Sequence, residues 1–440
     1  MKKLTSILTA ILFLSGIVYG QGTVIDTTFY SQSLDTTRFV KIYLPEGYNP
    51  NDVIRYPVIY YLHGFLSNQN SKPFIIDSVS ALIGNGTIKP VIFVKSDGRA
   101  KPLQSWDLKG SMYTNSELNG RFEDYIVYDL VDFIDTNYKT IASRDKRCIM
   151  GLSMGGGGAM TLALKHPDIY KGLASHSGRL EFNSINDLIP YVLAQSGGSP
   201  PYQYSPDNGF PSQLLFSLAS AFSPNLANPP YLVDFILDSS GNKVDSVWAK
   251  WLLHNPPKFA NALPPDTNLA IYFDCGEQDE LLLFPYNVNF ADSLDKLGLS
   301  YKFLPFQGGH SDKFYSRLPI SLTFLDLVIN VTATSISVEK FEKQVNVPQS
   351  IILHQNYPNP FNAQTMIEYQ LPQAGHVRLV IHNLLGQKIN TLIDRTLQAG
   401  LYRAVWDGKD SAGRIVPSGV YFYRLKVNHF SMTKKMLLLQ

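Results

Sequence analysis

The sequence contains few of the residues and patterns that mark several common classes of protein. Its 440 residues include only two cysteines, which leaves room for one internal disulfide at most. A net charge of +2 gives no reason to expect binding to nucleic acid. Neither a glycine-rich phosphate loop nor a zinc-ligand spacing occurs, so we expect no cofactor and no metal ion. Hydrophobic residues (45%) and charged residues (17%) are present as in ordinary globular proteins, and the length suits two domains.

Long apolar runs are also missing, except at the N-terminus. Two lysines open the chain, Leu4 to Tyr19 is largely apolar, and Gly20 ends a cleavage site before Gln21. This pattern predicts a signal peptide over residues 1–20. An N-terminal anchor helix is the alternative, but the run is short for a membrane span and lacks a charged stop. We therefore expect an exported protein with no transmembrane anchor in the mature chain.

One motif is typical of nucleophilic catalysis. The stretch Gly151-Leu152-Ser153-Met154-Gly155 matches G-x-S-x-G. A strand-like run, Arg147 to Met150, precedes it, and a helix-like segment, Ala159 to His166, follows. A serine at such a strand-to-helix turn is held with its hydroxyl exposed. We therefore predict that Ser153 is a nucleophile; the alternative is a glycine-rich turn without chemistry.

A nucleophilic serine needs a base, and in α/β-hydrolases the order along the chain is serine, acid, histidine. Of the nine histidines, His310 is the one that follows a strand-like run, Tyr301 to Pro305, in the right order. Two glycines directly before His310 let its loop fold back toward the serine. We predict that His310 is the general base.

The acid is expected between Ser153 and His310, just after a strand. The apolar run Leu269 to Cys275 is followed by a turn and then by Asp279. Asp279 is the preferred candidate because it lies beyond the end of the strand. Asp274, within the strand, and Glu277, in the turn, are the alternatives.

The oxyanion of the tetrahedral intermediate needs two backbone N–H groups. Met154 follows the nucleophile and is expected to supply one. The other is expected from the loop after an early central strand, Tyr56 to Leu62, where Phe65 follows His63 and Gly64. An ordinary turn is the alternative for this His-Gly pair.

Seven segments, in chain order, extend the similarity beyond these motifs: RFVKIYLPEGYN, YPVIYYLHGF, YTNSELNGRFEDYIVYDLVDFIDTNY, RCIMGLSMGGGGAMTLALKHPDIYKGLASHSG, FSPNL, FDCGEQDE and GGHSDKF. Residues 22–330 therefore resemble the putative-esterase family of α/β-hydrolases, which includes feruloyl and acetylxylan esterases and S-formylglutathione hydrolases. The resemblance implies Ser153 as nucleophile, Asp279 as acid, His310 as base, and Phe65 and Met154 as oxyanion donors.

The same resemblance places the two cysteines on different strands. Cys148 precedes the nucleophile and Cys275 precedes the acid, with one strand expected between them. Two strand spacings are roughly 10 Å, more than the roughly 7 Å between Cα atoms that a disulfide allows. We expect two buried free thiols.

The pattern of elements predicts an α/β-hydrolase fold over residues 21–330. Val24 to Tyr30 and Phe39 to Leu44 alternate like antiparallel edge strands, and helices alternate with strands after them, as in a mostly parallel sheet. Leu180 to Leu263 departs from this rhythm and is expected to form a cap-like insertion over the substrate pocket; a solvent-exposed insertion is the alternative. Candidate pocket residues are the aromatic side chains Tyr202, Tyr204, Phe216, Phe222, Trp248 and Trp251 in the insertion, and Trp106 and Tyr113 after the strand-like run Val91 to Val94.

The C-terminal part is expected to be separate. Residues 331–348 are interpreted as a linker, and residues 349–440 contain five strand-like runs separated by turns. NYPNPFN, LGQKI, AGLYRAVWDGKDSAGRIVPSGVYFYRL and TKKMLLL resemble the C-terminal sorting domain of type IX secretion cargo, which implies an all-β immunoglobulin-like sandwich. A carbohydrate-binding sandwich is the alternative.

Together these features predict a secreted or cell-surface serine esterase that acts through an acyl-enzyme. Export with a sorting domain implies the type IX machinery as a partner and favours an ester on a polymer. Feruloyl or acetyl esters of polysaccharide are the preferred substrates. The sequence leaves open a polyester substrate, acyl transfer to a sugar or lipid alcohol, and a non-catalytic surface binding protein.

Overall fold

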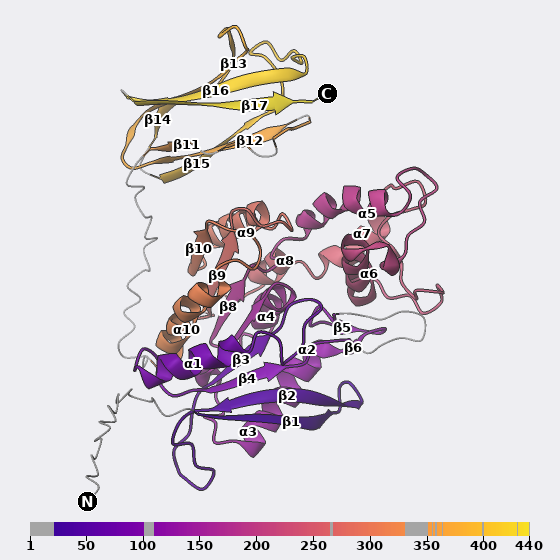
Figure 1. Ribbon diagram of the computed structural model, residues 1–440, viewed down its shortest axis with the longest axis vertical. Coiled ribbons are helices and arrows are strands. Elements are labelled where there is room, and N and C mark those ends of the chain that lie inside the picture. The colour runs from indigo at the N-terminus through magenta and orange to yellow at the C-terminus, as the bar shows by residue number, and fades with distance from the viewer. Residues whose placement is uncertain are drawn as a thin grey trace, which may run out of the picture. The chain divides into compact units, whose positions relative to one another are not determined.

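The computed structural model describes residues 22–100, 110–264, 267–330, 351–353, 355–356, 359–362, 364–397, 400–428 and 430–439. The chain divides into two compact units, Met1–Ile336 and Ser337–Gln440, which are described separately (Figure 1). The predicted signal peptide over residues 1–20, the predicted linker over residues 331–348 and Trp106 lie outside the described residues.

The first unit is built on an eight-stranded sheet with the order β1-β2-β4-β3-β7-β8-β9-β10. Its strands are β1 (Thr23–Ser31), β2 (Thr36–Leu44), β3 (Val58–Leu62), β4 (Ile92–Ser96), β7 (Arg147–Leu152), β8 (Gly172–His176), β9 (Ala270–Gly276) and β10 (Tyr301–Phe306). From β4 to β10 the neighbours are parallel, whereas β1 and β2 pair antiparallel at one side. The prediction of a mostly parallel sheet is therefore confirmed. Of the two predicted antiparallel edge strands, β1 is at the edge, whereas β2 lies between β1 and β4.

Helices cover both faces of this sheet, which explains why its central strands are apolar on both sides. Tyr61 and the side chains of α1 (Phe74–Gly84) and α10 (Phe314–Asn330) belong to one core, and Tyr60 and α4 (Met154–Lys165) belong to the other. The remaining elements of this part are β5 (Asn115–Ser116), β6 (Gly120–Arg121), α2 (Phe122–Asp124), the π-helical turn η1 (Tyr125–Asp129), α3 (Leu130–Asn137), η2 (Arg144–Lys146) and α9 (Phe284–Lys296).

The expected insertion follows β8 and is helical. It contains η3 (Phe182–Leu188), α5 (Ile189–Gln195), η4 (Pro206–Asn208), α6 (Phe210–Phe222), α7 (Asp245–Leu252) and α8 (Pro256–Asn261). In Figure 1, α5, α6 and α7 form a group to one side of the sheet. Trp251 and Leu215 are fully buried within it, so the insertion contributes its own apolar packing to the larger core.

The second unit is a two-layer antiparallel sandwich. One sheet contains β11 (Ile352–Leu353), β12 (Thr365–Leu371) and β15 (Gly400–Trp406). The other contains β14 (Lys388–Leu397), β13 (Gly375–His382), β16 (Gly419–Val427) and β17 (Phe430–Leu438). Trp406 from the first sheet and Tyr423 from the second share one buried core. The all-β sandwich is as predicted.

Two strands of this sandwich are absent from the sequence-based prediction. The longer is β14, an edge strand whose side chains are exposed or partly exposed along its whole length. Its pairing with β13 shifts register between Leu379 and Val380 and again between Ile381 and His382. Such irregularities break the period-two alternation by which a strand is recognised in a sequence.

Candidate active site

Ser153 lies at a sharp turn between β7 and α4. Its backbone has a φ of +59°, a strained value for a residue with a side chain. The turn is held because the Ser153 N–H donates to the carbonyl oxygen of His176 (2.8 Å), while the Ser153 carbonyl accepts from the N–H of Gly157 (3.0 Å). The helix begins at Met154, five residues before the predicted start, because tertiary packing overrides the low helix propensity of the glycines that follow.

Two glycines make this turn possible. A Cβ on Gly151 would lie 2.2 Å from the carbonyl oxygen of Gly155. A Cβ on Gly155 would lie 2.0 Å from the carbonyl oxygen of Leu62 on the neighbouring strand. Both contacts are with backbone, so the glycines of G-x-S-x-G are required by close packing of β3, β7 and α4.

The structure brings the three predicted triad residues into one hydrogen-bonded chain. His310 Nε2 lies 2.8 Å from Ser153 Oγ, and His310 Nδ1 lies 2.8 Å from Asp279 Oδ2. His310 and Asp279 are buried, with 8% and 5% of their surface exposed. When the imidazole is neutral, its Nδ1–H donates to Asp279 and its Nε2 accepts from the Ser153 hydroxyl. This arrangement can withdraw a proton from Ser153.

Other polar groups hold Asp279 and His310 in position. The second oxygen of Asp279 accepts from the N–H of Leu281 (2.8 Å). Glu280 accepts from the N–H of His310 (2.7 Å), and the Ser177 hydroxyl donates to the His310 carbonyl (2.7 Å). Glu280 and Ser177 are absent from the sequence-based prediction. Their position in the sequence could have identified them. Ser177 directly follows β8, and Glu280 lies in the turn after β9, next to Asp279.

The two alternative acids have other partners. Asp274 contacts His176 (2.7 Å) and Arg317 in the interior, and Glu277 accepts a hydrogen bond from the Gln307 side chain. Of these three carboxylates, only Asp279 contacts His310.

The residues expected to stabilise an oxyanion, Phe65 and Met154, line the same pocket as Ser153. Met154 opens α4, where the first N–H groups lack partners within the helix. The loop of Phe65 is anchored by the ring of His63, whose Nε2 accepts from the N–H of Gly98 (2.8 Å) and whose Nδ1 donates to the carbonyl of Gly64 (2.8 Å). These two hydrogen bonds anchor the loop.

Tyr113 has a different place from the one expected. It is 1% exposed and does not line the pocket. Its hydroxyl donates to the carbonyl oxygen of His63 (3.0 Å), and its ring packs on Gly158. The sequence predicted a substrate contact for Tyr113, and the structure places its side chain against the loop that contains Phe65.

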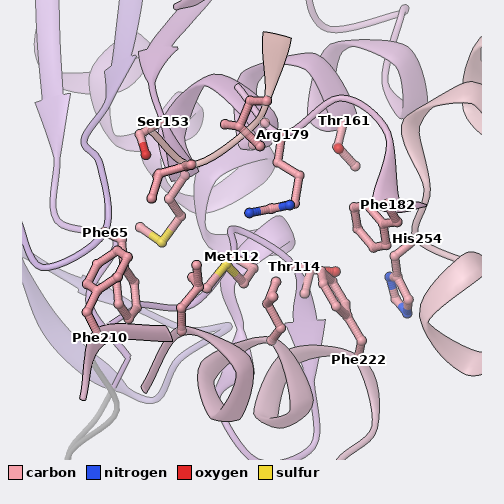
Figure 2. Close-up of a pocket in the computed structure, with 17 residues that line it drawn as sticks. Phe65, Met112, Thr114, Ser153, Thr161, Arg179, Phe182, Phe210, Phe222 and His254 are labelled. Carbon is pink, nitrogen blue, oxygen red and sulfur yellow. The ribbon is translucent and has the colours of Figure 1, made fainter. Parts of the chain in front are cut away.

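The pocket beside Ser153 is mainly apolar (Figure 2). The insertion provides much of its wall, and one charged side chain, Arg179, extends into it. The lining residues are Phe65, Met112, Thr114, Ser153, Met154, Gly157, Gly158, Thr161, Arg179, Phe182, Phe210, Leu214, Leu218, Phe222, His254, Leu281 and Leu283. Among the predicted aromatic residues of the insertion, Phe222 is part of this wall.

Trp248 and Trp251, which the sequence predicted as substrate contacts, are not among the residues that line this pocket. Both are buried in the packing of the insertion, and Trp251 Nε1 donates to Ser223 Oγ (2.8 Å). Phe216 stacks on Phe235 and Tyr204 makes a tilted contact with the same ring, and neither residue lines the pocket. Tyr202, a further predicted contact, stacks with Tyr204 and does not line this pocket, and Trp106 is outside the described residues.

Two ionisable groups of the pocket are perturbed by their surroundings. Burial lowers the pKa of Arg179 to about 10, so this side chain is still a cation at neutral pH. Burial lowers the pKa of His254 to about 4, so its ring is neutral there. Both residues are absent from the sequence-based prediction, although Arg179 lies three residues beyond the C-terminal end of the parallel strand β8, the side on which ligands bind in α/β sheets.

The cysteine prediction is confirmed. Cys148 and Cys275 are free and buried, and β8 lies between their strands β7 and β9. Burial raises the pKa of the Cys148 thiol, which keeps it protonated and unreactive.

Comparison with known proteins agrees with this architecture. Residues 31–317 match the family model described as putative esterase, and residues 355–439 match the secretion system C-terminal sorting domain. The second match indicates delivery to the cell surface or the exterior. In the described residues, no helix has the length and apolarity needed to cross a membrane.

Curated relatives match over part of their length. An endo-1,4-beta-xylanase/feruloyl esterase of Xylanibacter ruminicola is 33% identical over 189 residues, which are 40% of this chain and 25% of that protein. An esterase of Mycobacterium tuberculosis is 29% identical over 178 residues, which are 39% of this chain and 37% of that protein. The chain thus matches a quarter to just over a third of their lengths.

A solved ferulic acid esterase shares the fold. It superposes with a TM-score of 0.50 at 21% identity and covers 70% of this chain and 100% of its own.

Proposed function

This chain belongs to the putative-esterase family, and from that premise we propose that it is an exported serine esterase that cleaves carboxylic esters through an acyl-enzyme. The observation that carries the proposal is the hydrogen-bonded chain from Asp279 through His310 to Ser153, placed beside an apolar pocket. A module that only binds its ligand needs neither of these two hydrogen bonds.

In the proposed reaction, His310 Nε2 accepts the Ser153 proton while Oγ attacks the ester carbonyl carbon. The N–H groups of Phe65 and Met154 stabilise the resulting oxyanion. His310 then gives its proton to the alkoxy oxygen as the C–O bond breaks, and the alcohol leaves. Asp279 holds the ring and stabilises the imidazolium in both half-reactions.

Water completes the cycle. His310 removes a proton from a water molecule, whose oxygen attacks the acyl carbon of the Ser153 ester. The second tetrahedral intermediate collapses when His310 returns the proton to Ser153 Oγ. The carboxylic acid is released and the enzyme is restored.

For the substrate, we propose feruloyl or acetyl esters on polysaccharide. An apolar pocket with phenylalanine walls suits an aromatic acyl group, and the feruloyl esterase relative from Xylanibacter ruminicola supports the choice. Export by a sorting domain favours an extracellular polymer over an intracellular glutathione thioester. A polyester is the alternative substrate, because it is also an extracellular polymer with carboxylic ester bonds.

The decisive experiment compares wild type, Ser153→Ala and Ser316→Ala on methyl ferulate, acetylated xylan and a p-nitrophenyl ester. Ser316 is an exposed serine of α10 and serves as the matched control. We expect Ser153→Ala to fold normally and lose activity by roughly 10³-fold or more. A fluorophosphonate should label wild type and Ser316→Ala but not Ser153→Ala. Near wild-type turnover by Ser153→Ala would refute the proposal, and ester products formed with added alcohols would identify acyl transfer.

A further inference from the structure

Arg179 is a cation in a pocket that is otherwise mainly apolar. It lies three residues beyond the end of β8, and its side chain extends into the pocket between Ser153 and the side formed by Phe182 and His254 (Figure 2). Its guanidinium makes no hydrogen bond with Ser153, Asp279 or His310. Neither the fold nor the proposed chemistry therefore accounts for its position.

Its hydrogen-bonding capacity is largely unused. The guanidinium donates to the Ser184 hydroxyl, which is its single hydrogen bond within the described residues. None of the described carboxylates forms an ion pair with it. A guanidinium has five N–H donors, so several remain available to a ligand in the pocket. The side chain is partly exposed in the pocket, so these donors can reach a bound ligand.

Two further polar groups border the same pocket. Thr161 of α4 contributes a hydroxyl and His254 a neutral ring. For neither side chain does the described part of the chain provide a hydrogen-bond partner. His254 stacks on Phe222, with ring centres 4.7 Å apart. Aromatic surface and unused polar groups therefore occur together at this end of the pocket.

We propose that Arg179 is a specificity residue that selects acyl groups carrying a neutral oxygen acceptor, such as a hydroxyl, ether or carbonyl oxygen, beyond the ester carbonyl. The inference rests on the proposed function, because it takes the pocket beside Ser153 as the acyl site. The aromatic walls hold the body of the acyl group, and the guanidinium donates to its distal oxygen.

The choice of a neutral oxygen over a carboxylate follows from the surrounding charges. Asp279, Asp187 and Glu181 act electrostatically on Arg179 without pairing with it. The positive charge is therefore already partly compensated, and a further carboxylate would meet three acidic neighbours. A neutral acceptor uses the free N–H donors and adds no charge.

The test uses esters that differ only at the distal position: methyl cinnamate, methyl 4-hydroxycinnamate and methyl 4-carboxycinnamate. We expect the wild-type kcat/KM for the hydroxy ester to exceed that for methyl cinnamate by about tenfold or more, as for a hydrogen bond to a charged group. In Arg179→Met this ratio should fall to near one. Arg179→Lys, which keeps the charge but loses the planar fork, should give an intermediate ratio. Arg121→Met, which removes a surface arginine paired with Asp124, should leave the ratio unchanged.

A binding measurement separates this inference from the esterase proposal. Cinnamamide and 4-hydroxycinnamamide are titrated calorimetrically into full-length wild type and each variant, and thermal unfolding verifies that the variants are folded. We expect tighter wild-type binding of the hydroxy amide and no such preference in Arg179→Met. Equal binding of both amides by wild type, or a preference that survives in Arg179→Met, overturns the role of Arg179. A higher kcat/KM for the carboxy ester than for the hydroxy ester overturns the choice of a neutral acceptor. Missing hydrolysis with this binding preference intact counts against the esterase proposal alone.

Discussion

The carboxylate of Asp274 lies 2.7 Å from Nδ1 of His176 in the interior of the hydrolase domain. It also pairs with Arg317 and accepts from the Tyr272 hydroxyl (3.1 Å). Five residues later, Asp279 makes the same type of contact with His310 (2.8 Å), but beside the pocket. One segment of chain thus provides two histidine–carboxylate pairs, one sealed in the core and one in contact with Ser153.

These two pairs are expected to respond differently to the same substitution. Asp279→Asn should lower kcat by roughly 10⁴-fold with little change in thermal unfolding, because the amide favours the wrong imidazole tautomer. Asp274→Asn should cost about 3 to 5 kcal/mol of stability, because it leaves the buried Arg317 without its counter-charge. Denaturant unfolding and kinetics on one activated ester provide the measurements. A stable, inactive Asp274→Asn protein together with an active Asp279→Asn protein would assign the acid to Asp274.

The elbow glycine Gly155 is expected to tolerate no side chain. Gly155→Ala places a Cβ 2.0 Å from the Leu62 carbonyl oxygen, so β3 and α4 must separate. We expect a loss of more than about 3 kcal/mol, or failure to fold. Gly64→Ala is the matched control, since its Cβ would make ordinary contacts at 3.4 Å with Leu152 and Ser153. If urea denaturation shows equal stability for the two variants, close packing is not the reason why the turn at Ser153 requires glycine at position 155.

Acid should destabilise the protein in part through His254. Burial lowers the folded-state pKa of His254 to about 4, whereas an unfolded histidine titrates near 6.5. Above pH 6.5 the His254 ring is neutral in both the folded and the unfolded state, so its full contribution to the free energy of unfolding is present. As the pH falls from 6.5 toward 4, only the unfolded chain takes up the proton, and stability of the order of 2 to 3 kcal/mol is lost.

The measurement is the free energy of unfolding of wild type and His254→Phe between pH 4 and pH 8. Phenylalanine keeps the stacking on Phe222 and removes the titration. The wild-type value minus the variant value should be constant above pH 6.5 and fall toward pH 4. A difference that stays constant over the whole range would contradict a buried neutral ring.

Removal of the sorting domain should separate delivery from catalysis. All proposed catalytic residues precede the end of α10 at Asn330, and the first unit has its own cores. A chain that ends at Asn330 is expected to stay soluble and keep its kcat on a small ester. In the native host it should accumulate inside the cell envelope, which is measured by assaying periplasmic and external fractions. Normal external delivery would exclude a sorting role for residues 349–440. Activity lost only on insoluble polymer would indicate a binding module.

Local patterns in the sequence were sufficient to predict those features that depend on a single turn or on the order of strands. The turn at Ser153 is an example, because Gly151 and Gly155 are required by contacts made within one strand–turn–helix unit and its neighbour. His310 followed from chain order and a glycine-rich loop, and the mostly parallel sheet followed from alternating strands and helices. The free cysteines followed from strand order.

Tertiary structure decided which side chains of the insertion face the pocket. Phe222 and Trp251 are both aromatic and lie in the same segment, yet Phe222 lines the pocket while Trp251 is buried with its N–H on Ser223. Composition cannot distinguish them, because the direction of each side chain depends on how α6 and α7 pack on each other and on the sheet. Arg179 was missed for the same reason: only the folded chain leaves its guanidinium nearly unpaired in an apolar pocket. The sequence by itself determined the turn at Ser153 and the chain order of Ser153, Asp279 and His310, which short-range sterics and connectivity impose. The pocket surface depends instead on packing between distant segments.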